Sequence, residues 1–122
     1  MSSAATTYSM ILGDLMKKYW EDQGLTQQEF FQASGISTGN WSRLMRGQAH
    51  FQMEDIRNAC RVLGTTVHEL TGKADKLEQT LQEKEDVVVV SKDDLKKDDS
   101  KVPAIIAGAA LGFLLAKALS GK

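Results

Sequence analysis

The chain contains few of the residues that build disulfides, metal sites or aromatic clusters. Among its 122 residues are one cysteine, one proline and two histidines, and aromatic residues make up 7%. A single cysteine, Cys60, excludes a disulfide within the chain and favours a reducing compartment. The histidines and the cysteine do not have the spacing of a convincing metal site. Because no apolar run lies near the start, we expect no secretory signal and a cytoplasmic location.

Neither sign of charge dominates the composition. The 15 lysines and arginines are matched by 16 aspartates and glutamates, which leaves a formal net charge of -1. The sequence also lacks paired carboxylates in an apolar setting, an activated nucleophile pattern and a phosphate-binding glycine loop. We therefore expect no enzymatic activity, no cofactor and no metal.

Residues 9–72 predict a small all-α domain of five short helices, after a disordered start at residues 1–8. Apolar residues at i, i+3, i+4 and i+7 predict helices over about residues 9–23 and 53–63. Capping boxes begin the second and fifth helices, at Thr26 with Glu29 and at Thr66 with Glu69. Glycine follows the expected end of each of the first four helices, where it can adopt the left-handed backbone that stops a helix.

The third predicted helix has one apolar side and one small polar side. Ser37 is a favourable N-cap, and Trp41, Leu44 and Met45 share the apolar side. The other side carries hydroxyl, amide and guanidinium groups. We expect the Trp41 indole to lie in the core, and this pattern is typical of a helix that contacts a ligand along its polar side.

The stretch GLTQQEFFQASGISTGNWSRLMRG resembles the helix-turn-helix of phage repressor and Cro-type DNA-binding domains. Its most specific elements are Leu-Thr-Gln, Gly-Ile-Ser and Trp-Ser-Arg-Leu, and FQMEDIRNACRVLGTTVHEL is similar to the family's fourth and fifth helices. The resemblance covers about residues 12–70. It implies a repressor-like fold whose third helix enters the major groove of double-stranded DNA.

The resemblance also implies which residues touch DNA. Base readers fall at the positions of Thr38, Gly39 and Arg43, although Gly39 offers no side chain there. Gln27 matches a phosphate-contacting glutamine, and Arg43 has the chemistry to pair with guanine, worth roughly 1–3 kcal/mol of discrimination. The candidate DNA-binding residues are Gln27, Ser37, Thr38, Gly39, Asn40, Ser42, Arg43, Arg46 and Gln48.

The charge of the predicted domain is low for a DNA-binding protein. Residues 1–72 carry six lysines and arginines against seven aspartates and glutamates. Affinity for DNA depends largely on neutralised phosphates, so a single copy should bind weakly. We expect a homo-oligomer, in which clustering raises the effective concentration of the second domain.

Residues 73–101 predict a charged connector, either helical or flexible. Leu70, Leu77, Leu81, Val88 and Leu95 follow heptad spacings, but too few core positions are apolar for a coiled coil. Val87 to Val90 is a β-prone run that could pair strand to strand between two chains. A solvated helix followed by a flexible linker is the simpler interpretation.

Residues 102–122 form an apolar tail, which we expect to be helical. Val102 to Ala116 carries no charge, and residues 102–119 as a helix would extend about 27 Å, just short of a ~30 Å hydrocarbon layer. Small residues recur every four positions, which suits close helix packing. These are Ala104, Gly108, Gly112 and Ala116. A membrane anchor, a self-associating helix and a helix folded back onto the domain all remain open.

The sequence thus predicts a sequence-specific DNA-binding protein of bacterial or phage type, with transcription control as its use. Its tail would tether it to the cytoplasmic face of the inner membrane or assemble it into oligomers. The alternative is a protein-interaction or membrane scaffold protein that keeps a helix-turn-helix fold. The near-neutral charge of residues 1–72 supports that alternative.

Overall fold

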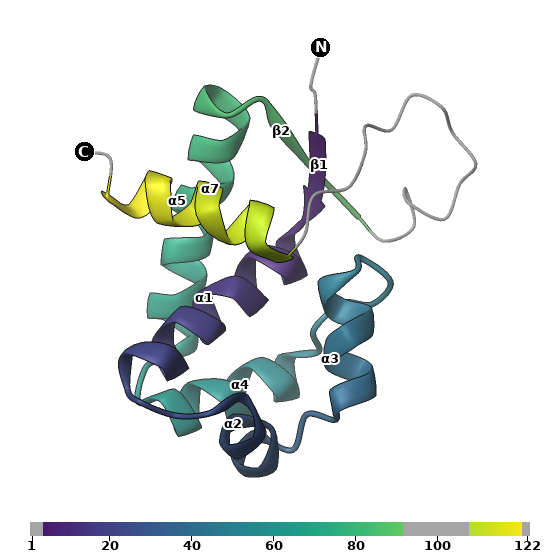
Figure 1. Cartoon of the computed structure of the whole chain (residues 1–122), viewed down its shortest axis with the longest axis vertical. Helices are drawn as coiled ribbons and strands as arrows, with labels where there is room; N and C mark the ends of the chain where they lie inside the picture. The colour runs from purple at the N-terminus through teal and green to yellow at the C-terminus, as the bar shows by residue number, and fades with distance from the viewer. Residues whose placement is uncertain (1–3, 92–107, 121–122) are drawn as a thin grey trace.

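The chain folds into helices arranged around a central first helix, with a short two-stranded sheet at one end (Figure 1). The computed structural model describes residues 4–91 and 108–120. The elements are β1 (Ala4–Thr7), α1 (Tyr8–Asp22), α2 (Gln27–Ser34), α3 (Thr38–Met45), α4 (Met53–Leu63), α5 (Val67–Lys84), β2 (Val87–Val90) and α7 (Gly108–Ser120). The predicted all-α, five-helix repressor-like class is confirmed, with the sheet and α7 as additions.

The helix boundaries follow the local signals in the sequence. Thr26 and Glu29 form the reciprocal capping box at α2, and Gly35 ends that helix with φ 81°. The second expected box is incomplete: the Thr66 hydroxyl accepts a hydrogen bond from the Glu69 amide at 3.0 Å, but the Glu69 carboxylate accepts from the hydroxyl of Thr65. α5 therefore begins where expected, with different side-chain partners.

The core is a continuous apolar cluster centred on α1. Met10, Ile11 and Met16 are completely buried, together with Phe30 of α2 and Leu44 of α3. α1 contacts α2, α3, α4, α5 and α7, so nearly every side of it is covered. This arrangement explains why the apolar residues of α1 extend beyond one helical stripe: a helix surrounded by others is buried on most faces.

The N-terminal residues form a strand where the composition predicted a disordered start at residues 1–8. Ala4–Thr7 pairs in parallel with Val87–Val90, with Ala4 opposite Val87. Ala5, Thr6 and Thr7 are fully buried, and the Thr7 hydroxyl accepts a hydrogen bond from the Met10 amide at 3.1 Å as the N-cap of α1. Polar composition indicated disorder, but pairing with the valine run satisfies this backbone. The valine run therefore pairs with a strand of its own chain, a partner that the sequence did not indicate.

The fifth helix is longer than the short helix expected to end near residue 72. α5 continues to Lys84 and buries Ala74, Leu77 and Leu81. Leu77 and Leu81 are two of the heptad positions of the connector, and they face the core of the same chain. The compact unit therefore includes the helical half of the connector, because α5 packs along α1 and leads directly into β2.

The described part of the tail, α7, packs against α1 and α5 (Figure 1). Leu111 and Leu115 are buried, whereas Phe113 is 70% exposed. The face packed within this chain thus contains a leucine pair, whereas Gly112 has open space beside it and Ala116 is exposed. The role of the small-residue stripe in helix packing stays a prediction. Ala104 lies outside the described residues. None of the helices in the ranges 4–91 and 108–120 is long and apolar enough to cross a bilayer.

Candidate nucleic-acid interface

Two short helices, α2 and α3, meet through a tight turn at residues 35–37. Gly35 adopts a left-handed backbone, and its N–H donates to the carbonyl of Phe31 at 2.9 Å. The Ser37 hydroxyl then accepts from the Asn40 amide at 3.1 Å, which starts α3 at once. Local hydrogen bonds therefore define both ends of the turn, and the helix axis changes direction within three residues.

A cluster of aromatic rings holds α3 against the domain from behind. Trp41 lies with its ring centroid 5.3 Å from that of Trp20 and 5.4 Å from that of Phe31, and Phe51 adds an edge contact at 6.0 Å. Trp41 is only 9% exposed. Such aromatic pairs stabilise a core by about 0.5–1.5 kcal/mol each beyond simple burial. The expected core role of Trp41 is confirmed, and its burial directs the opposite side of α3 outward.

Two small residues of α1, Gly13 and Ser9, also position α3, and sequence reasoning missed both. A Cβ atom at Gly13 would meet the sulfur at the flexible end of Met45 and would lie 3.4 Å from the Trp41 ring, so Gly13 packs closely against α3. The buried Ser9 hydroxyl accepts from the Phe51 amide at 3.0 Å and fixes the loop that follows α3. A glycine inside a helical pattern signals close packing, whereas nothing in the sequence identified Ser9.

The nine candidate DNA-binding residues, which we call the polar face, belong to α3, to the turn and loop that flank it, and to the start of α2. Eight of them are exposed and Asn40 is half-buried, while its backbone amide is used by the Ser37 cap. The residues of the polar face are Gln27, Ser37, Thr38, Gly39, Asn40, Ser42, Arg43, Arg46 and Gln48. The inward packing of Thr38 and Arg43 that would have excluded a role in binding does not occur.

The polar face carries available positive charge. Neither Arg43 nor Arg46 forms an ion pair within the described part of the chain; the pairs found there are Lys18 with Asp22 and Lys117 with Glu85. The Arg43 carbonyl accepts from the Gln48 amide at 2.8 Å, which orders the loop after α3. Because these arginines have no ion-pair partner there, their guanidinium groups can meet an anion without first breaking an internal ion pair. At the start of α2, hydrogen bonds from the Thr26 backbone and hydroxyl lower the pKa of Glu29.

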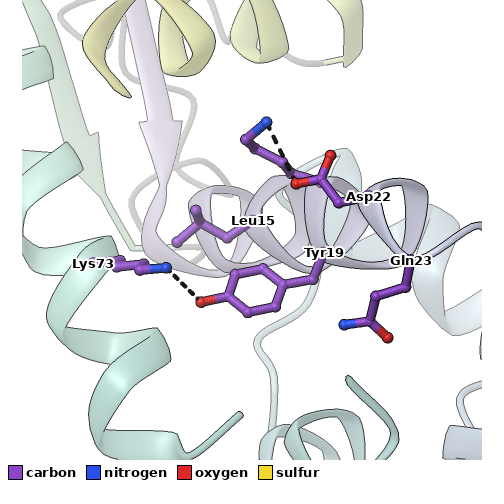
Figure 2. A pocket seen from close by; sticks show the side chains of 6 residues that line it. Leu15, Tyr19, Asp22, Gln23 and Lys73 are labelled. Atoms are coloured by element: carbon purple, nitrogen blue, oxygen red, sulfur yellow. Dashed lines mark hydrogen bonds and ion pairs between the residues drawn. The ribbon is translucent and has the colours of Figure 1, made fainter. Parts of the chain in front are cut away.

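A separate cavity of about 220 Å³ lies between α1 and α5 (Figure 2). Its polar groups are already paired: the Lys73 ammonium donates to the Tyr19 hydroxyl at 2.8 Å, and the Gln23 amide donates to the Leu63 carbonyl at 2.7 Å. The bond to Tyr19 is the main reason that the pKa of Lys73 is raised. No residue of α2 or α3 lines this cavity. Its contacts dock α5 on α1, and it is distinct from the polar face.

Two helices joined by a three-residue turn, the second anchored by an indole and polar on its outer side, define the helix-turn-helix class of DNA-binding domain. A family model described as a helix-turn-helix domain matches residues 11–71. Because this match spans half of the sequence, the chain belongs to the helix-turn-helix domain family. Comparisons with curated proteins and with solved structures found no match.

Proposed function

We propose that the protein binds double-stranded DNA in a sequence-specific manner through the polar face and acts as a transcriptional regulator. The observation that carries the proposal is the outward position of Arg43 and Arg46, which have no ion-pair partner among the described residues, on a helix whose other side is anchored by Trp41. An α-helix of this width fits the major groove, and its N-terminal residues reach the base edges.

Four of the exposed residues have side chains whose chemistry matches a group on DNA. Arg43 can donate two parallel hydrogen bonds to a guanine, and Thr38 and Ser42 can donate to or accept from any base edge. Gln27, at the start of α2, suits a phosphate oxygen, because the free backbone amides there also favour an anion. These contacts combine base recognition by α3 with positioning on the backbone by α2.

The proposal is tested by selecting bound duplexes from a random pool with the full chain, then measuring affinity by mobility shift at low salt. Arg43→Ala should weaken binding roughly 5- to 150-fold, which corresponds to the loss of one bidentate base contact. Arg61→Ala is the matched control, since Arg61 is exposed on α4 outside the polar face and hydrogen bonds to Asn58. Equal affinity of both variants would contradict base reading by Arg43.

We also propose that two copies bind together, because the low charge of residues 1–72 makes a single domain a weak phosphate binder. The selected duplexes should then contain two half-sites about one helical turn apart. Binding should rise more steeply with protein concentration than for a single site. A lone half-site bound by one copy would show that oligomerisation is not needed.

The scaffold function is the second candidate, and the near-neutral domain is the observation that favours it. In that case the polar face would bind a protein. Affinity capture with the wild-type chain and with Arg43→Ala separates the two functions. If Arg43→Ala loses a protein partner while DNA retention is unchanged, the polar face is a protein-binding surface.

Tethering through residues 102–119 stays a prediction, and it would require a change in the fold. Leu111 and Leu115 are buried in the domain, so α7 would have to leave α1 and α5 before it entered a bilayer. Fractionation of cells that express the chain with and without residues 102–122 measures this directly. An unchanged distribution after the deletion would exclude a membrane role for the tail.

A further inference from the structure

Gly39 is a glycine that the fold does not require. Gly24, Gly35, Gly47 and Gly64 have a positive φ, and Gly13 is crowded by Met45. Gly39, by contrast, has an ordinary helical backbone, and a Cβ placed on it would meet no atom within 4 Å. Glycine is the poorest helix former after proline. Its presence in an eight-residue helix therefore weakens α3, and nothing in residues 4–91 or 108–120 makes a contact that requires it.

The place of Gly39 on α3 suggests what its missing side chain permits. Ser42 and Arg43 stand three and four residues further along, so all three share one side of the helix. An α-helix with its side chains is roughly 10–12 Å wide, close to the roughly 12 Å width of the major groove. Removing a side chain on the DNA-facing side lets the helix axis come nearer to the bases.

We propose that the backbone of α3 touches DNA at Gly39, and that this close approach sets the depth at which Ser42 and Arg43 reach the base edges. The inference rests on the proposed DNA-binding function. Ser42 depends most on this depth, because its hydroxyl is only one atom beyond Cβ and the residue is exposed. A side chain that short reaches a base edge only from a helix that lies deep in the groove.

The test uses the full chain and the duplex that the wild type selects. Gly39→Ala should melt at the same or a slightly higher temperature, since alanine is the better helix residue. It should nevertheless bind at least about tenfold more weakly, the scale of one lost base contact. Gly39→Leu should bind more weakly still. Gly72→Ala is the matched control, because Gly72 is also exposed with open space around it, but lies in α5.

A double-mutant cycle with Ser42→Ala gives a readout that a merely structural role would not move. If Gly39 sets the depth, removing the hydroxyl should weaken binding by the wild type but have little effect in the Gly39→Ala background. Binding by Gly39→Ala within about twofold of the wild type would overturn the inference and leave DNA binding intact. Additive losses would also overturn it. A wild-type chain that retains no duplex would overturn both the inference and the proposed function.

Discussion

Asp14 carries a buried charge that should make the stability of this protein depend on pH. It lies on α1, and its Oδ2 atom is buried without a hydrogen-bond partner in the described structure. Desolvation raises the pKa of this carboxyl from its ordinary value of 3.8 to about 6; Glu21 adds to the effect and Lys17 opposes it. The folded state therefore favours the protonated acid.

The size of the effect follows from the two pKa values. Below pH 3.8 the carboxyl is protonated in both the folded and the unfolded chain, so folding does not bury a charged group. As the pH rises through about 6, the folded protein must ionise Asp14 in place, and that part of the stability is lost. The difference between the two pKa values corresponds to about 3 kcal/mol in the free energy of unfolding. Because part of the side chain still reaches solvent, we expect about 2 kcal/mol.

Asp14→Asn removes the charge and keeps the shape, so urea unfolding of the variant and the wild type isolates this term. The variant should gain about 2 kcal/mol relative to the wild type at about pH 7.5, and this gain should vanish near pH 4. Asp22→Asn is the control, since Asp22 lies on the same helix with a side chain that is 66% exposed and paired to Lys18. A stability difference that is the same at both pH values would refute the reasoning.

Three further substitutions, one of them a control, test the packing that positions α3 and α7. Trp41→Ala should cost about 3–5 kcal/mol in the free energy of unfolding, because it opens a cavity among Trp20, Phe31 and Phe51. Denaturant titration measures this loss, and a value below about 1 kcal/mol would contradict the packing. Leu111→Ala should cost about 2–5 kcal/mol in the free energy of unfolding, whereas Phe113→Ala, two residues further along α7 and exposed, should change it by less than about 0.5 kcal/mol. Equal effects of these two changes in thermal unfolding would show that α7 does not dock through its leucines.

The helix-turn-helix was predictable because its signals are local. Ser37 and its amide partner are three residues apart, and Gly35 ends α2 through its own backbone geometry. Trp41 was recognised as core because helical periodicity placed it opposite the polar residues. The exposure of the polar face followed from that same periodicity, although the DNA contacts themselves stay predictions.

The contacts missed by the sequence analysis join distant segments. Ser9 accepts a hydrogen bond from the Phe51 amide, 42 positions away. Neither composition nor local pattern indicates a contact between residues that far apart. The same holds for Asp14: it was counted as an ordinary charge, because only the packed structure shows that one of its oxygens has no partner.

Caps, glycine stops and apolar spacing were thus enough to specify where the five helices begin, where the first four end and which side of α3 faces outward, since each depends on neighbours within one or two turns. Only the folded chain showed that Ala4–Thr7 pairs with Val87–Val90 and that α7 turns its leucines toward α1 and α5. A strand or an apolar helix must bury one side, but its own sequence does not determine which element it packs against. That partner is selected by the surface that the rest of the fold leaves uncovered.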